Sequence, residues 1–437
     1  MDVAQEVVRA KDVSYGLEAL GTDVKNGALD AMARALDSNR GRIIEANGID
    51  VSEAKEAFGR GELTDSMVKR LIVTDEKIDG MIAGIRDVIS LKDPVGETMS
   101  TMELDDGLTL YQIRCPIGVL GVIFESRPDV VPQIMSLCLK SGNAVVFKGG
   151  REASNTNRVL FDILTEAAYS SGIPEGAFVL MQSREDVNAI LSMDGYIDLL
   201  IPRGSNSFVR YIQDNTRIPV LGHAAGICHV YLDEHADLEM GLQVMVDSKV
   251  QYPAVCNAVE TLLINSKVAA DILEELDAEL SGKGVEIRAD ERAIAGMPHA
   301  VMAKESDWDK EYNDLIVSVK VVDSVDEAIR FINTHGSHHT DCIITSDKGN
   351  MLRFVRGVDS ADVFVNASTR FADGYRFGKG AEVGISTNKI HSRGPVGMEG
   401  LMIYKYVLIG NGQVVRDYVG KDARPFKHRT VKKEFAP

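Results

Sequence analysis

Two short apolar runs, IGVLGVIFE at residues 117–125 and NAVVFK at residues 143–148, flank an apolar stretch that ends at Gly142. Near-continuous apolar runs of this length are typical of strands that are buried on both faces of a parallel sheet. The stretch from about 129 to 141 is predicted to be a helix, with Gly142 at the C′ position after its end. The sequence therefore predicts a strand–helix–strand unit.

The same alternation continues along the chain. Residues 153–172 are predicted to be a helix, and the apolar runs FVLMQ and IDLLIP follow it before residue 202. This βαβαβ rhythm predicts a doubly wound α/β sheet with a nucleotide site. A second α/β series begins near residue 260 and includes ETLLIN, LIVSVKVV, TDCIITSD and DVFVNAS.

The ends of the chain have other patterns. Residues 1–92 are predicted to be mainly helical, with Thr74 as the N-cap of a helix whose apolar residues recur at helical spacing. Residues 107–115 and 401–410 resemble strands. The last residues are basic and polar, which predicts a loosely ordered tail.

Composition excludes several classes of protein. The 437 residues carry a formal net charge of −17, whereas general binding to nucleic acid or a membrane surface needs a positive field. The N-terminus has no apolar signal core, and no apolar run approaches the ~20 residues of a membrane span. The five cysteines are widely spread without a CxxC pair. This pattern suggests neither a zinc site nor a disulfide framework and favours a reducing cytoplasm.

Basic residues follow two of the predicted strands. Lys148 and Arg151 lie just past the end of one strand, at the edge where such sheets bind ligands. Gly204 and Ser205 form a turn between another strand and a helix start, where free N–H groups can meet a phosphate. For Lys148 and Arg151, the alternative is a solvated turn that binds no ligand. The glycine pattern at 378–384 follows a polar segment, so it is not a dinucleotide fingerprint.

The stretch from 370 to 393 reverses the charge of the acidic chain, since it has five basic and two acidic residues among several glycines. It is a candidate loop for binding an anionic substrate, and the alternative is a solvated loop that binds no ligand. Its basic residues are Arg370, Arg376, Lys379, Lys389 and Arg393.

One cysteine has a different setting from the others. Cys256, in VQYPAVCNAVETLLIN at 250–265, falls on a predicted loop between a helix at about 237–250 and a strand. The others lie in predicted strands or an apolar helix: Cys115, Cys138, Cys228 and Cys342. An acyl-transfer cysteine needs such a loop, but a buried cysteine also serves as a small hydrophobe. Spacing alone leaves both roles open.

The stretches at 116–150, 250–265 and 370–401 together resemble the γ-glutamyl phosphate reductases, a branch of the aldehyde dehydrogenase superfamily. The resemblance runs over about residues 1–415. It implies an aldehyde dehydrogenase-like α/β fold with two doubly wound domains. The implied parts are an NADP-binding domain (1–105 and 122–231), a catalytic domain (232–400), a β oligomerisation element (106–121 and 401–419) and a basic tail (420–437).

The resemblance also implies an activity. It is the NADPH-dependent reduction of L-glutamyl 5-phosphate to L-glutamate 5-semialdehyde in proline biosynthesis, with phosphate released and a thioester formed on Cys256. The backbone N–H of Cys256 is the first expected oxyanion donor. We expect a homo-oligomer whose substrate comes from a separate glutamate kinase. The alternatives are a CoA-acylating aldehyde dehydrogenase and a catalytically silent NADP-binding protein.

Several further residues take roles from the resemblance. His223 stands where hydrolytic relatives carry a water-activating glutamate, so it is expected either to move a proton or to be structural. Glu125 or Arg127 falls where those enzymes carry an oxyanion-hole asparagine. Arg127 is also a candidate contact to the substrate phosphate.

Cofactor and substrate contacts follow from the same alignment. Arg151 replaces the carboxylate that holds NAD ribose hydroxyls, which favours NADP. Glu311 matches the glutamate that holds the nicotinamide ribose. Arg370, His391 and Arg393 are candidates for binding the amino acid part of the substrate.

Overall fold

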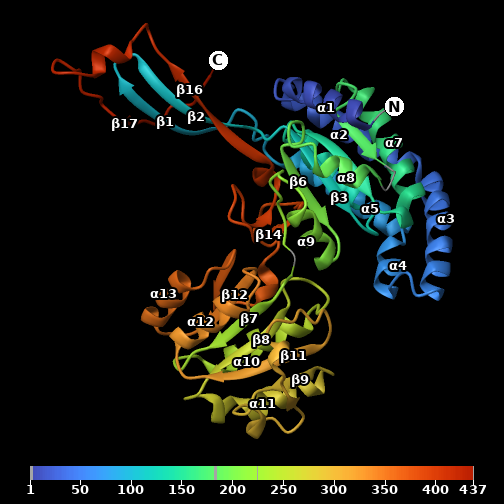
Figure 1. The fold of residues 1–437 in the computed structure, drawn as a ribbon, viewed down its shortest axis with the longest axis vertical. Coiled ribbons are helices and arrows are strands. Elements are labelled where there is room, and N and C mark those ends of the chain that lie inside the picture. The colour runs from blue at the N-terminus through green and yellow to red at the C-terminus, as the bar shows by residue number, and fades with distance from the viewer. Residues whose placement is uncertain (1–2, 182–184, 224, 437) are drawn as a thin grey trace. The chain divides into compact units, whose positions relative to one another are not determined.

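The computed structural model describes residues 3–181, 185–223 and 225–436, which form two compact units. Figure 1 shows their elements along the chain. Unit 1 contains Met1–Gly204, Tyr211–Val220 and Gly397–Pro437, and unit 2 contains Ser205–Arg210 and Leu221–Val396.

Helices begin unit 1, as the sequence predicted. Within the described residues these are α1 (Val3–Leu17), α2 (Thr22–Ser38), α3 (Arg40–Gly59), α4 (Asp65–Leu71) and α5 (Asp75–Ser90). The Thr74 side chain accepts a hydrogen bond from the Lys77 backbone N–H and so caps α5. The apolar face of α5 is buried, which confirms the predicted helix.

A parallel sheet forms the centre of unit 1, in the order β5-β4-β3-β6. Its strands are β3 (Val119–Phe124), β4 (Ala144–Gly149), β5 (Phe178–Met181) and β6 (Leu199–Arg203). The helices between and after them are α6 (Val130–Lys140), α7 (Ser154–Tyr169), α8 (Glu185–Leu191) and α9 (Asn206–Asp214), of which residues 206–210 belong to unit 2. Gly142 has a φ of +74° just after α6, as expected at C′. The strand order reverses between β3 and β6, where doubly wound sheets bind ligands.

A second sheet in unit 1 is antiparallel, in the order β16-β2-β1-β17. Its strands are β1 (Thr98–Asp105), β2 (Leu108–Pro116), β16 (Met402–Ile409) and β17 (Arg429–Thr430). The strands predicted at 107–115 and 401–410 are confirmed. The prediction of a loosely ordered tail is wrong, because β17 pairs with β1 and the ring of Phe435 packs on Tyr111 at 5.4 Å.

Unit 2 contains a seven-stranded sheet in the order β10-β9-β11-β8-β7-β12-β13, and all its paired strands are parallel. Its strands are β7 (Cys228–Leu232), β8 (Val259–Asn265), β9 (Glu286–Ala289), β10 (Val301–Met302), β11 (Ile316–Val322), β12 (Thr340–Ile344) and β13 (Asp362–Val365). Its helices are α10 (Leu238–Val250), α11 (Ala269–Gly282), α12 (Val325–His335) and α13 (Lys348–Gly357). A small hairpin joins β14 (Gly384–Ser386) to β15 (Gly394–Val396).

Single 3₁₀ turns complete the described structure. They are η1 (Arg151–Ala153), η2 (Ile294–Gly296), η3 (Glu305–Asp307), η4 (Thr369–Phe371), η5 (Met398–Leu401) and η6 (Val415–Tyr418).

Both faces of the sheet in unit 2 are buried. Val230 and Leu232 of β7 pack in one apolar cluster with residues of α10 and α11, whereas Tyr231 packs in another with residues of α12 and α13. This alternation follows from the two-residue period of a strand. The predicted α/β fold with two doubly wound sheets is confirmed.

The boundary between the units differs from the expected one. The resemblance placed residues up to 231 in the cofactor domain. In the structure β7 instead pairs with β8 and β12 inside the sheet of unit 2, and the longer segment of that unit begins at Leu221. No helix among the described residues combines the length and hydrophobicity needed to cross a membrane.

Candidate active site

Cys256 lies on the loop between the end of α10 and the start of β8, which confirms the predicted location. It is half-buried, whereas the other four cysteines are buried. Burial raises the pKa of each of those four thiols, so they remain protonated and poorly nucleophilic. Cys256 is therefore the accessible thiol of the chain.

Buried groups hold both ends of this loop. Lys249, at the end of α10, forms an ion pair of 2.7 Å with Glu260 of β8, and both side chains are buried. Burial raises the pKa of Glu260 to about 7, and the positive charge of Lys249 opposes that shift. Next to the cysteine, Asn257 Nδ2 donates a hydrogen bond of 2.8 Å to the Ala372 carbonyl.

Gly226 contacts the backbone of Cys256 directly. A Cβ atom on Gly226 would lie 2.2 Å from the carbonyl oxygen of Cys256 and 2.5 Å from its Cα. The thiol of Cys228 also donates to that carbonyl oxygen at 3.2 Å. Only glycine leaves room for the cysteine loop at this position.

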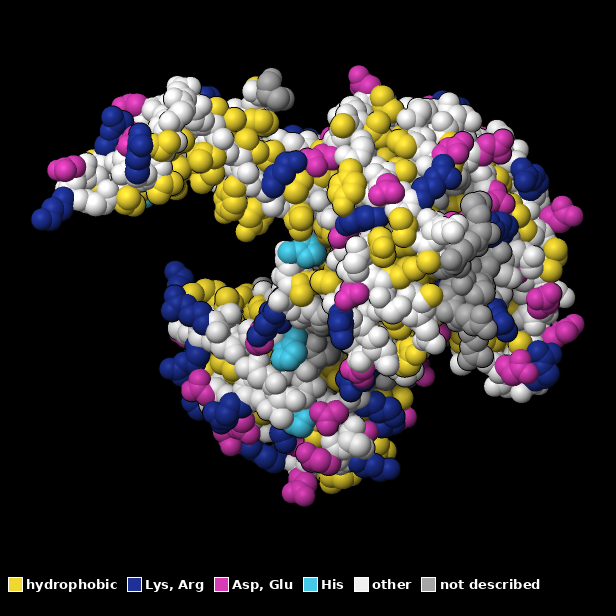
Figure 2. Space-filling model, turned by 45° about the horizontal axis from the view of Figure 1, so that its top comes forward, with side chains coloured by type: hydrophobic (Ala, Val, Ile, Leu, Met, Phe, Trp, Pro, Cys, Tyr) yellow, Lys and Arg dark blue, Asp and Glu magenta, His cyan; other side chains and the backbone are white. Residues whose placement is uncertain are grey.

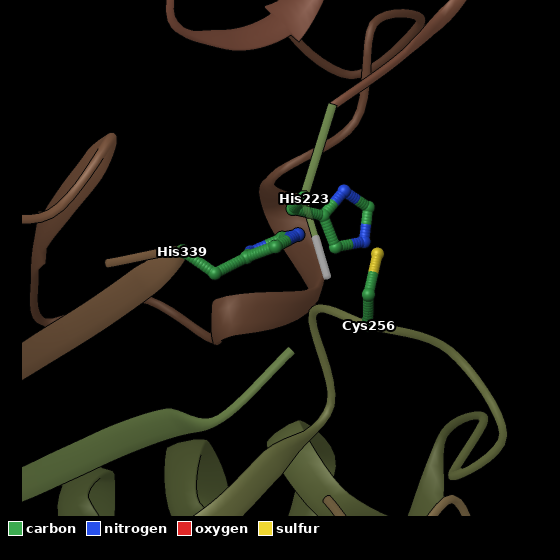
Figure 3. Close-up of side chains that lie close together, drawn as sticks. All are labelled: His223, Cys256 and His339. Carbon is green, nitrogen blue, oxygen red and sulfur yellow. The ribbon is translucent and has the colours of Figure 1, made fainter. Parts of the chain in front are cut away.

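Two histidines face the Cys256 sulfur (Figure 3). The Nδ1 atom of His223 lies 2.9 Å from the Ile385 carbonyl oxygen. Because a carbonyl only accepts, Nδ1 carries the proton and Nε2 is the basic nitrogen. The Cys256 sulfur and one ring nitrogen from each of His223 and His339 lie within 4.8 Å of one another. His223 is therefore placed to exchange a proton with the thiol.

His339 was not predicted from the sequence. Its ring is buried and meets that of His223 edge to face, with 5.0 Å between centroids. Its Nδ1 atom hydrogen-bonds the Thr340 hydroxyl at 2.8 Å. It stands beside His338 in the sequence, and no local pattern distinguishes the two.

Arg370 is the residue of the basic stretch whose pKa is affected by the charge of Cys256. Its guanidinium is buried and donates a hydrogen bond of 2.9 Å to the side-chain oxygen of Gln251. Burial lowers the pKa of Arg370, the charge of Arg376 adds to that effect, and the negative charge of an ionised Cys256 opposes it. A cation in this environment suits an anionic substrate.

Other basic residues of the stretch have carboxylate partners. Lys389 and Arg393 both pair with Asp359, at 2.5 and 3.1 Å. These two cations share one carboxylate, which offsets one of their two positive charges within unit 2, whereas His391 is exposed.

The cofactor candidates of unit 1 follow the carboxyl end of β4. Lys148 is buried and donates to the Gly149 carbonyl oxygen at 2.5 Å, while Arg151 is exposed. Asp50 accepts hydrogen bonds from the backbone N–H groups of Asn155 and Thr156 at 3.2 and 2.7 Å. These amides of α7 are thus already bonded, and Lys148 and Arg151 are the positively charged candidates at this strand end.

The remaining candidates lie at other turns. Gly204 and Ser205 follow β6 and are exposed. The side-chain amide of Asn206 donates to Glu311 at 2.7 Å, so the structure brings Glu311 to this turn. In unit 1, Arg127 is half-buried after β3, and Glu125 donates its backbone N–H to the Arg203 carbonyl oxygen at 2.9 Å.

Comparisons with known proteins identify the family to which the chain belongs. The aldehyde dehydrogenase family model matches residues 22–299. A γ-glutamyl phosphate reductase of Methanosarcina mazei is 60% identical over 440 residues, covering 99% of this chain and 98% of the relative. That of Methanococcoides burtonii is 61% identical, covering 98% and 97%. The crystal structure of the Thermotoga maritima γ-glutamyl phosphate reductase matches with a TM-score of 0.91 and 40% identity, covering 95% and 100%.

The chain therefore belongs to the aldehyde dehydrogenase family and, within it, to the γ-glutamyl phosphate reductases. Membership of this family implies a nicotinamide cofactor.

The contact between Gly226 and Cys256 predicts the effect of one added methyl group. We expect Gly226→Ala to displace the cysteine loop and to lower kcat/KM at least ~10-fold, because small displacements of a reacting group are costly. Steady-state kinetics and circular dichroism measure activity and folding. Gly282→Ala is the control, since a Cβ there meets no atom within 4 Å. Wild-type kinetics in Gly226→Ala would contradict the proposed constraint.

Proposed function

We propose that the protein reduces L-glutamyl 5-phosphate to L-glutamate 5-semialdehyde in proline biosynthesis, releasing inorganic phosphate, with Cys256 as nucleophile. The proposal is supported by relatives that are 60% identical along the whole chain and are named γ-glutamyl phosphate reductase. The observation that carries the mechanism is the half-buried Cys256 beside the basic nitrogen of His223.

The first step is acyl transfer to sulfur. The Nε2 atom of His223 accepts the thiol proton, and the Cys256 sulfur attacks the acyl carbon. A carbon–sulfur bond forms while the bond from carbon to the phosphate oxygen breaks. The Cys256 backbone N–H is the first donor to the developing oxyanion. The second donor is expected at the position of Glu125 or Arg127.

The second step releases the aldehyde. When bound at the residues proposed below, a reduced nicotinamide would supply the hydride that reduces the thioester. As the carbon–sulfur bond breaks, a proton returns to sulfur through His223, and the thiol is restored. After the first step His223 holds the proton from the thiol, so it cannot accept a proton from water and does not activate water against the thioester before reduction.

The cofactor is NADP in this proposal. In the strand order β5-β4-β3-β6, β4 corresponds to the second strand of a dinucleotide-binding sheet, whose end carries the group that selects the ribose. Arg151 after β4 suits a 2′-phosphate, and Lys148 adds charge at the same edge. Gly204, Ser205 and Glu311 are the further contacts in the proposal.

The substrate's anionic groups require cations. Arg370 is the strongest candidate in unit 2, because it is buried and coupled to the charge of Cys256. Arg127 is proposed to contact the phosphate that leaves. His391 and Arg393 remain candidates for the amino acid part, and Asp359 weakens the case for Arg393.

The antiparallel sheet of unit 1 is proposed to join copies of the chain. Strand β16 lies at its edge and exposes large apolar side chains: Ile403, Tyr404, Tyr406, Leu408 and Ile409. Figure 2 shows hydrophobic side chains gathered along this sheet. An exposed apolar edge strand favours association with another strand or surface. We also propose that a separate kinase supplies the substrate in a reducing cytoplasm, where Cys256 stays a thiol.

Replacement of the nucleophile tests the mechanism. We expect Cys256→Ser to lose at least ~10³-fold in phosphate-dependent NADP reduction with the semialdehyde as substrate, because the hydroxyl is a far weaker nucleophile. Cys115→Ser is the control. Replacing phosphate by CoA in the same assay tests the acylating alternative, for which CoA alone would support turnover. Normal turnover by Cys256→Ser would overturn the mechanism.

The cofactor assignment predicts a change of preference. We expect Arg151→Glu to raise the KM for NADPH about 10-fold or more, since a charged hydrogen bond is lost and a like charge is added. The KM for NADH should change little. Arg158→Glu, at a half-buried residue of α7, is the matched charge reversal. Equal effects of the two variants would argue against a 2′-phosphate contact at Arg151.

The proposed oligomer predicts a concentration-dependent assembly. We expect Tyr406→Glu to shift the protein toward monomer in size-exclusion chromatography with light scattering, because a charge is placed in the apolar face. Tyr15→Glu changes an exposed tyrosine on α1 and is the control. An unchanged molar mass for Tyr406→Glu would exclude this edge as the interface.

A further inference from the structure

We propose that Cys256, His223 and His339 form a binding site for Zn²⁺ or a similar transition-metal ion, and that its occupation reversibly inhibits the enzyme. The sequence suggested no zinc site, because the three residues belong to segments far apart in the chain. The binding of the metal stands on the geometry alone, and only the inhibition rests on the proposed function.

Sheet topology brings the three ligands together. His223 precedes β7, Cys256 precedes β8 and His339 directly precedes β12. Because β7 pairs with both β8 and β12, these positions lie at the amino ends of three adjacent parallel strands. Figure 3 shows their side chains converging.

The donor set and spacing suit zinc. A thiolate and imidazole nitrogens are its preferred ligands, with a Zn–S distance of about 2.3 Å and Zn–N distances of about 2.0–2.1 Å. A tetrahedral site with these bonds separates its ligand atoms by about 3.3–3.6 Å. The three ligand atoms here already lie within 4.8 Å of one another, so small side-chain rotations close the site.

Each imidazole is oriented as metal-bound histidines usually are. His223 donates its Nδ1–H to the Ile385 carbonyl oxygen at 2.9 Å. His339 Nδ1 bonds the Thr340 hydroxyl at 2.8 Å, and that hydroxyl donates toward Asp362 at 3.5 Å. Such outer partners fix the ring and make the other nitrogen a better ligand.

The burial of His339 independently supports a ligand at this site. Its side chain is fully buried, and its Nε2 atom has no hydrogen-bond partner among the described residues. An unpartnered buried polar atom is costly, so a ligand at that nitrogen is favoured. A metal ion bound there would meet Cys256 and His223 as its other ligands.

Binding and inhibition follow from one event. The metal displaces the thiol proton of Cys256 and takes up the sulfur electron pair that otherwise attacks the acyl carbon. Three protein ligands leave one position open for water or an anion. No electron is transferred, so removal of the metal restores the thiol and the activity.

The test uses the substrate-free, full-length protein and Co²⁺ as a spectroscopic probe of the zinc site. We expect a sulfur-to-cobalt charge-transfer band and visible bands of a four-coordinate ion, both lost on addition of Zn²⁺. Cys256→Ser should lose the charge-transfer band. Its persistence in Cys256→Ser, or its absence in the wild type, would overturn the site regardless of which substrate the enzyme reduces.

Inhibition is then measured relative to the uninhibited activity of each variant. We expect His339→Gln to raise the Zn²⁺ concentration for half-inhibition at least ~10-fold, because even a lost outer-shell contact costs 10–100-fold in metal affinity. A chelator should restore wild-type activity. His235→Gln, at an exposed histidine, is the control and should match the wild type. Identical Zn²⁺ sensitivity of His339→Gln and wild type would exclude His339 as a ligand.

Discussion

The buried ion pair between Lys249 and Glu260 holds the two ends of the loop that presents Cys256. One partner lies at the end of α10 and the other near the start of β8, so the pair joins the two ends of the loop. Both side chains are buried, and removing one partner would leave an uncompensated charge at a typical cost of about 3–5 kcal/mol. Because these anchors lie below the surface, the loop can expose its thiol while its backbone stays in place against Gly226.

The candidate site residues lie at opposite ends of the parallel strands in the two units. In unit 1 the cofactor candidates follow the carboxyl ends of β4 and β6, which is the usual ligand edge of such a sheet. In unit 2 Cys256 and both histidines precede the strands β8, β7 and β12. The proposed nucleophile therefore does not lie at the carboxyl ends of the strands, where such sheets usually bind their ligands. Its environment comes from short loops that converge because three neighbouring strands begin side by side.

Local pattern was sufficient for much of this fold. Apolar runs located the strands on either side of α6, and the position of Cys256 between a helix and a strand was visible in the sequence, since both features depend on neighbouring residues. His339 was not foreseeable, because its approach to Cys256 depends on the order β8-β7-β12, which no local spacing encodes. The pairing of Arg393 with Asp359, and of the C-terminal β17 with β1, likewise joins distant segments.

The acyl phosphate substrate and the proposed metal ion would compete for Cys256, and the charges around it affect the two differently. Arg370 is a buried cation whose pKa responds to the sulfur, so its field attracts an acyl phosphate and repels a metal dication. Within the proposed mechanism, both ligands use the same sulfur electron pair, so binding of one excludes bonding to the other. His223 serves the first as proton acceptor and the second as ligand, through the same Nε2 atom. His339 differs, because acyl transfer as proposed assigns it no bond, whereas the metal gives its buried Nε2 a partner. The anionic substrate therefore protects the thiol that the metal would otherwise occupy.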